Sequence, residues 1–253
     1  MVLAHLIYDK SSLLACSLTC YSWYIVVVPH LHHTFTTFTF FFRAEKFLWP
    51  RSLLHIHRLG LLPLVKRLNI YGVSSYDGFS PKWLNLFFLP RFFTLTHVQE
   101  LDIEDLNIPM FMPRVQRYFR HFFPTVRSLT LRKPMGCRWQ ILYFIGLFQH
   151  LEDLKLFFAR RSRSLEGQVN DPTLIPPFAP PLQGWLEMSY VGRAVPEDMI
   201  NLFRGIRFRY MDLFRVDGMP LLLEACAGTL ETLRLDLLDP HGVQLCPKGV
   251  WKF

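Results

Sequence analysis

The most regular feature of the chain is a short unit of apolar and polar positions that recurs from residue 65 onward. Each unit has an aliphatic residue, two mostly polar residues, a second aliphatic residue, one polar residue and a third apolar residue. The copies begin roughly 20 to 30 residues apart, which is the spacing of a repeat protein. They are VKRLNI (65–70), VQELDI (98–103), VRSLTL (126–131), LEDLKL (151–156), LETLRL (230–235), and the looser LQGWLEM (182–188) and FRYMDL (208–213).

The alternation at the end of each unit predicts a short strand with one apolar side. A single strand cannot bury that side, whereas stacked copies bury it in a parallel sheet with return segments packed against it. The Leu-x-x-Leu-x-Leu core is typical of leucine-rich repeats. We therefore expect an α/β fold, an irregular leucine-rich-repeat solenoid with parallel strands and covering helices. A doubly wound α/β domain also alternates strand and helix, but the repeated core favours the solenoid.

Helices are expected in the segments that return the chain from one copy to the next. At 138–149, Trp139, Leu142, Tyr143 and Leu147 recur at helical spacing. The three further segments each open with a proline, which suits the first turn of a helix. The other expected helices span 113–123, 196–204 and 220–227.

Two stretches do not follow the repeat. Residues 158–181 mix Arg, Ser and Gly with five prolines, which predicts a loop. Residues 238–253 lack the polar capping unit that solenoids use at their ends. We therefore expect the chain to be a fragment, or to end in an altered reading of a longer protein.

The N-terminal region, residues 1–34, has a helical pattern, followed by a β-branched and aromatic extended segment at 34–42. Asp9 or Ser11 is placed to cap the helix, and Pro29 is expected to end it. Apolar side chains recur at steps of three and four, so we expect them on one buried face. They are Leu13, Cys16, Cys20, Trp23 and Val27, with Leu14 and Leu18 widening the face.

Composition narrows the class of protein. Hydrophobic residues make up 51% of the 253 positions, so the chain must bury a sizeable core. No apolar window reaches the roughly 18 residues that a membrane span needs, so we expect no membrane partner. The net charge is +8, but the one tight basic cluster, Arg160, Arg161 and Arg163, has no interleaved aromatics. We interpret it as a solvated loop and do not expect nucleic acid as a partner.

The chain shows little sign of catalytic or metal chemistry. There is no nucleophile elbow, P-loop or dinucleotide motif. Most acidic residues occupy solvent-facing strand positions, so we expect a charged concave face and no enzyme, no catalytic residues and no cofactor. The acids are Glu100, Asp102, Glu152, Asp153, Glu231 and Asp236.

Histidines and cysteines are the remaining candidates for chemistry. Five histidines fall close together, at His30, His32, His33, His55 and His57, but no second ligand cluster follows, so we expect no metal site. The thiols of Cys16 and Cys20 are interpreted as packing groups instead of reactive ones, since no cation is placed beside them. Five cysteines, an odd number, indicate free thiols in a reducing compartment, the cytoplasm or nucleus.

Residues 11–24, SSLLACSLTCYSWY, resemble the second half of an F-box. The hallmark of that motif is an apolar helix that runs into (Ser/Ala)-Leu-x-Cys-x-x-Trp, and Ser17, Leu18, Cys20 and Trp23 stand at those places. Residues 26–35, VVVPHLHHTF, are similar to the exit from the F-box in many fungal F-box proteins. Those proteins continue into degenerate leucine-rich repeats. The resemblance implies a partial F-box-like segment at 1–42 and a repeat domain at 43–253.

The resemblance also implies a function. F-box proteins are non-enzymatic adaptors that dock on the Skp-type linker of a cullin–RING ubiquitin ligase and recruit a protein substrate through their repeats. The docking residues carried over are Leu13, Leu14, Leu18, Cys20 and Trp23, and the strand-lined face and the proline-rich loop would hold the substrate.

One part of the family pattern is missing. The usual Leu-Pro-x-Glu opening is absent and only residues 2–7 match the end of the first helix, so we expect an F-box truncated at its N-terminus. The alternatives are a repeat scaffold without ligase docking and a truncated, non-functional product.

Overall fold

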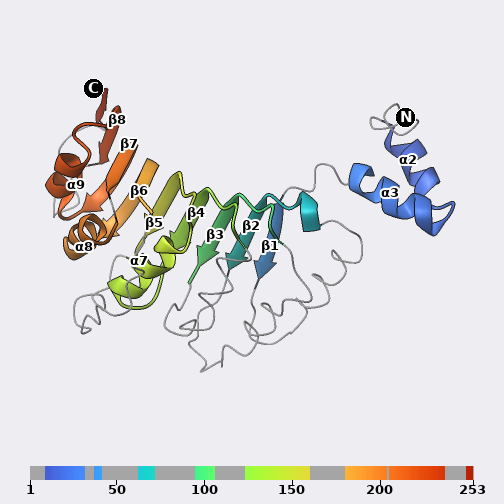
Figure 1. Ribbon diagram of the computed structural model, residues 1–253, viewed down its shortest axis with the longest axis horizontal. Coiled ribbons are helices and arrows are strands. Elements are labelled where there is room, and N and C mark those ends of the chain that lie inside the picture. The colour runs from blue at the N-terminus through green and yellow to red at the C-terminus, as the bar shows by residue number, and fades with distance from the viewer. Residues whose placement is uncertain are drawn as a thin grey trace.

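The described residues fold around a sheet of nine strands in which each strand pairs with the next described strand along the sequence. The computed structural model describes residues 9–31, 37–41, 62–71, 95–105, 123–159, 180–203, 205–236 and 249–252. Strands β1 to β8 run parallel, and β9 runs antiparallel to β8 (Figure 1). The strands are β1 (Thr37–Phe41), β2 (Arg67–Tyr71), β3 (Glu100–Glu104), β4 (Ser128–Arg132), β5 (Asp153–Phe157), β6 (Leu182–Val191), β7 (Ile206–Val216), β8 (Thr232–Asp236) and β9 (Gly249–Lys252).

The strand order confirms the α/β class and excludes the doubly wound alternative. A doubly wound sheet reverses its strand order at a switch point, whereas here the order rises without a break from β1 to β9. All seven copies of the repeated unit lie in or run into strands β2 to β8. The extended segment expected at 34–42 is also confirmed in part, as β1. Because β1 pairs with β2, the sheet begins before residue 43, inside the segment assigned to the helical unit.

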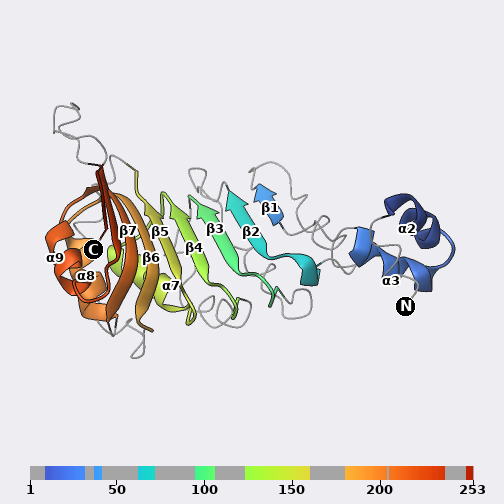
Figure 2. The ribbon, with the colours of Figure 1, turned by 90° about the horizontal axis from the view of Figure 1, so that it is seen from above.

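Helices α7 (Arg138–Gly146), α8 (Ala194–Leu202) and α9 (Met219–Ala225) lie on one side of the sheet (Figures 1 and 2). They confirm three of the four expected return helices. The fourth, at 113–123, and the loop at 158–181 lie outside the described residues except at their ends. A short 3-10 helix, η1 (Leu62–Leu64), leads into β2.

The four residues of α7 and its end that recur at helical spacing are not equally buried. Leu142 is buried, but Trp139, Tyr143 and Leu147 are only partly buried. Ile141, Phe144 and Ile145 fill the core in their place. The helix reads RWQILYFIG and is apolar on nearly all sides, so spacing alone does not select its inward face.

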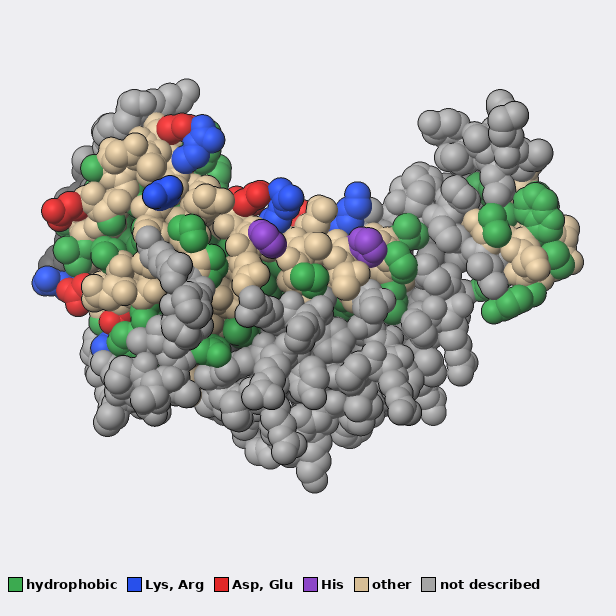
Figure 3. Space-filling model, viewed as in Figure 1, with side chains coloured by type: hydrophobic (Ala, Val, Ile, Leu, Met, Phe, Trp, Pro, Cys, Tyr) green, Lys and Arg blue, Asp and Glu red, His purple; other side chains and the backbone are tan. Residues whose placement is uncertain are grey.

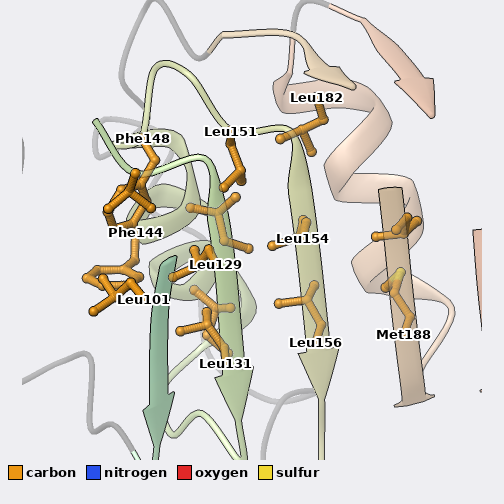
Figure 4. Close-up of a cluster of buried hydrophobic side chains, with 14 of the residues drawn as sticks. Leu101, Leu129, Leu131, Phe144, Phe148, Leu151, Leu154, Leu156, Leu182 and Met188 are labelled. Atoms are coloured by element: carbon orange, nitrogen blue, oxygen red, sulfur yellow. The ribbon is translucent and has the colours of Figure 1, made fainter. Parts of the chain in front are cut away.

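The core contains two rows of apolar side chains that cross the sheet in register (Figure 4). Each strand from β2 to β8 contributes one residue to each row, and α7, α8 and α9 pack against them. The rings of Phe144 and Phe148 meet edge to face at 5.4 Å beside the rows. The first row is Leu68, Leu101, Leu129, Leu154, Leu186, Met211 and Leu233. The second is Ile70, Ile103, Leu131, Leu156, Met188, Leu213 and Leu235.

The N-terminal region forms two helices, α2 (Lys10–Ser17) and α3 (Tyr21–Leu31), so the single helical face predicted there is wrong. Local hydrogen bonds mark the end of α2. Ser17 Oγ donates to the Leu14 carbonyl and Thr19 Oγ1 to the Cys16 carbonyl, both at 2.7 Å. The Leu18 N–H is shared between the Leu14 and Ala15 carbonyls, at 3.3 and 3.2 Å, so the last turn tightens where the helix ends.

The expected end of this region at Pro29 is also wrong. Helix α3 continues to Leu31. Pro29 lies in its last turn, where the missing N–H removes a single backbone hydrogen bond of the helix.

Gly184 allows β6 to pass close to the segment that leads into β5. Its φ is +85°, and a Cβ at this position would overlap the backbone oxygen of Glu152. We expect Gly184→Ala to lower the free energy of unfolding by about 2 kcal/mol. Alanine is strained at this positive φ, and its Cβ would also clash with the backbone of Glu152. Gly192→Ala is the matched control, since nothing lies within 4 Å of a Cβ there. Urea unfolding of both variants measures the difference, and equal stabilities would contradict the prediction.

Candidate functional site

The side of the sheet opposite the helices carries charged and polar side chains, and we call it the polar face. Its residues alternate with the two core rows along the strands. Figure 3 shows blue and red side chains gathered along the upper edge of the sheet. One row is Arg67, Glu100, Ser128, Asp153, Trp185, Tyr210 and Thr232. The next is Asn69, Asp102, Thr130, Lys155, Glu187, Asp212 and Arg234.

Ion pairs join neighbouring strands across the polar face, which confirms the charged face expected from the sequence. Lys155 Nζ lies 3.0 Å from Glu187 Oε2, between β5 and β6. Further pairs link the other strands, and most of these side chains are roughly half exposed. Exposed pairs contribute at most about 1 kcal/mol each, so they neutralise the face more than they stabilise it. These pairs are Arg67–Glu100, Arg127–Glu152, Arg132–Asp102, Lys133–Glu104, Arg209–Glu231 and Arg234–Asp212.

Over β2 to β5 the polar face is hollowed, with a volume of about 620 Å³. Arg67, Asn69, Asp102, Arg132 and Lys155 are among its lining residues. Burial raises the pKa of the Asp102 carboxyl, and Arg132, whose Nε is 3.3 Å away, opposes the rise. The hollow therefore offers hydrogen-bond donors and acceptors of both charges at short range, which suits contact with the polar backbone and side chains of a protein.

Strands β6 and β7 carry aromatic side chains on the polar face. Trp185 stacks on Tyr210 with ring centroids 5.6 Å apart, and Tyr190 meets Phe214 edge to face at 5.1 Å. Trp185 is 40% exposed. It is therefore an exposed apolar side chain on a face that carries mostly charged and polar residues. Nothing in the repeated unit distinguishes these positions as functional, because aromatic residues are common in strands.

The five F-box-like residues are divided between the interior and the surface. Leu13 is fully buried, as expected. Leu14, Leu18 and Trp23 are 54%, 79% and 40% exposed, and Cys20 is exposed, so the prediction that they pack inward is wrong. Val27 on α3 is fully buried, as predicted. The buried residues among the described apolar side chains of α2 and α3 are therefore Leu13 and Val27, and the residues that were expected to widen the face are exposed.

Helices α2 and α3 together present an apolar surface. In addition to Leu14, Leu18 and Trp23, the exposed large apolar side chains include Tyr21 and Val26, which the sequence pattern did not single out. Figure 3 shows these helices as a cluster of hydrophobic side chains at the right of the view. Of the six exposed large apolar residues in the described parts of the chain, only Trp185 lies elsewhere. We call the five residues of α2 and α3 the helical apolar surface.

Asp9 holds the start of α2, as the sequence predicted. Its Oδ1 accepts hydrogen bonds from the backbone N–H groups of Ser11 and Ser12 at 3.1 and 3.2 Å. Hydrogen bonds from the hydroxyls of both serines add to these and lower the pKa of the carboxyl to about 2. The cap therefore stays charged at neutral pH and stabilises the first turn of α2, the helix that carries Leu14.

The described cysteines, Cys16, Cys20, Cys137 and Cys226, are all free thiols. Burial raises the pKa of Cys226, so its thiol stays protonated at neutral pH. Cys246 lies outside the described residues, as do the arginine cluster and all of the candidate histidines except the backbone of His30. Within the described residues no three His, Cys, Asp or Glu side chains are grouped to hold a metal. No helix there is long and apolar enough to cross a membrane.

Comparison with protein-family models, curated proteins and solved structures finds no match to this chain. Two surfaces of the chain itself are therefore the basis for a function. The first is the polar face of the sheet, and the second is the helical apolar surface.

Proposed function

We propose that the chain is a non-enzymatic adaptor similar to the substrate-recruiting F-box subunit of a cullin–RING ubiquitin ligase. The observation that carries this proposal is the helical apolar surface. Exposed apolar patches on soluble proteins mark interaction sites, because water contact with them is unfavourable. Leu18 and Trp23 belong both to this surface and to the F-box-like motif. The surface is therefore proposed to dock on a Skp-type linker.

The sheet supports the second half of the proposal. The recurring Leu-x-x-Leu-x-Leu core and the unbroken strand order agree with a degenerate leucine-rich-repeat solenoid. Its polar face would hold a protein substrate, and the adaptor would raise the concentration of that substrate near the ligase. The chain would carry out no covalent chemistry and would act in the cytoplasm or nucleus.

A second candidate function is a protein-interaction scaffold that does not dock on a ligase. The polar face favours it, because its ion pairs and its hollow involve no residue of α2 or α3. In that case the partner would bind the sheet alone.

Titration of the full chain with a purified Skp-type linker separates the two functions. We expect a Kd of about 1 μM or tighter, and a loss of about 30-fold when Leu18→Asp and Trp23→Ala are combined, since a buried Trp anchor is a common hot spot. Arg127→Gln on the polar face is the control and should bind as the wild type does. Linker binding weaker than about 1 mM, with the protein still folded by thermal melting, would reject ligase docking and leave the scaffold.

A further inference from the structure

We infer that the aromatic residues and the free arginine on β6 and β7 form a site for an extended acidic peptide that carries an apolar side chain. We call Trp185, Tyr190, Tyr210, Phe214 and Arg215 the aromatic patch. The inference rests on the proposed substrate-recruiting role of the polar face and specifies the chemistry of the partner.

The aromatic patch combines rings and a cation at contact distance. The guanidinium of Arg215 lies 5.5 Å from the ring centroid of Tyr190 and 5.6 Å from that of Phe214. Trp185 and Tyr210 form the second, stacked pair on the same two strands. Trp, Tyr and Arg are the residue types that most often dominate binding energy at protein interfaces.

Two left-handed backbone positions bring Tyr190 and Arg215 to this surface. Their φ values are +56° and +50°, which are uncommon for residues other than glycine. Each follows a polar-face residue, Ser189 or Phe214, which are paired with one another across the strands. The left-handed turn interrupts the alternation of the strands, and both Tyr190 and Arg215 contact the ring of Phe214. Tyr190 also packs partly against the core.

The charge of Arg215 is available to a partner. Among the described residues it forms no ion pair. Three carboxylates on or beside β6 to β8 already have basic partners: Glu187 pairs with Lys155, Asp212 with Arg234 and Glu231 with Arg209, at 3.0, 3.5 and 2.5 Å. A partner that supplies a carboxylate would therefore give Arg215 an opposite charge.

The same charges favour a peptide over a nucleic acid. Binding a single strand needs a row of cations that follows the phosphates, as well as stacking rings. Here Lys155, Arg209 and Arg234 already pair with carboxylates, so they do not form a row of free cations for successive phosphates, whereas a peptide with a single acid needs only Arg215. An apolar side chain on the exposed ring of Trp185 and a carboxylate on Arg215 are what the aromatic patch can satisfy.

Selection from a random-peptide phage library on the immobilised full chain tests the site. We expect selected peptides to be enriched in Asp or Glu about five residues from Leu, Phe or Trp, because Trp185 and Tyr190 are separated by five residues along β6 and an extended peptide has the same rise per residue. Arg215→Glu should select Lys or Arg in place of the acid, because it reverses the free charge. Trp185→Ala should weaken the best wild-type peptide by about 30-fold. Arg193→Met, at the start of α8 on the opposite side of the sheet, is the control and should select as the wild type does.

Three outcomes would overturn the inference: no enriched peptide, the same peptide composition with Arg215→Glu, or peptide affinity that Trp185→Ala leaves unchanged. Tight binding of a single-stranded oligothymidylate that is lost with Trp185→Ala would assign the patch to nucleic acid instead. Linker binding measured on the same preparations separates this result from ligase docking, because Trp185 and Arg215 lie outside α2 and α3. Thermal melting of each variant confirms that it is folded.

Discussion

Replacing Leu129 with alanine is expected to lower the free energy of unfolding by about 3 kcal/mol. Leu129 is fully buried and stands in register between Leu101 and Leu154 in the first core row. Removing its branched end leaves a cavity that neighbours on two strands cannot fill, because each of them is held by its own strand pairing. The loss combines the transfer of the methyl groups with the cost of the cavity.

Urea unfolding monitored by circular dichroism measures this loss. Leu18→Ala is the matched control, because Leu18 is 79% exposed and its truncation should change stability by about 0.5 kcal/mol or less. If the two substitutions had equal effects, the continuous core row across β3, β4 and β5 would be wrong.

The second large effect is expected at the ion pair that joins α7 to α8. Arg138 Nε contacts Asp198 Oδ2, and the two side chains are only 21% and 12% exposed. Both atoms are buried and have no other hydrogen-bonding partner in the described part of the chain. Arg138→Met should lower the free energy of unfolding at pH 7 by about 3 kcal/mol, since it leaves the Asp198 charge buried without a counter-ion.

The pH dependence of Arg138→Met identifies the cause. Burial already raises the pKa of Asp198 above its ordinary value, with Arg138 opposing the rise. A carboxyl with a raised folded pKa adds stability below its unfolded pKa, and this is lost as the pH rises through the folded pKa. Without Arg138 the folded pKa rises further, so the defect should be larger at pH 7 than at pH 4.

Arg193→Met is the control for this pair. Arg193 pairs with Glu197 on the surface of α8, where its side chain is 72% exposed. Its loss should cost about 0.5 kcal/mol or less, with little change over the same pH range. A defect of Arg138→Met that is independent of pH would show that lost packing, and not the unpaired carboxylate, is responsible.

The strands could be predicted from the sequence because their signal is local. Val98, Leu101 and Ile103 show the alternation within six residues, and every copy repeats it. The inward face of α7 could not be predicted in this way, because Trp139 and Ile141 are both apolar and only tertiary packing decides which is buried. The break after α2 could not be predicted from the hydrophobic pattern, because Cys16 and Cys20 continue the helical spacing across it.

The candidate site was harder to predict from the sequence than the fold. A pattern of apolar residues is interpreted as a buried face, so Leu18 and Trp23 were expected inside, whereas the structure leaves them exposed. The acidic residues at strand positions correctly predicted a charged face of the sheet. The aromatic patch includes Tyr190 and Arg215, whose backbones are left-handed. This conformation could not be predicted, because Tyr and Arg rarely adopt it.

The unbroken strand order makes the sheet a molecular ruler. Neighbouring strands lie about 4.8 Å apart, so β6 lies roughly 24 Å from β1 along the direction in which the strands follow one another. Inserting or deleting one strand unit between them would move a ligand on β6 and β7 by about one such step relative to the N-terminal end of the sheet. In a recruiting adaptor, the number of strands would therefore set the reach between the bound partner and the enzyme that acts on it.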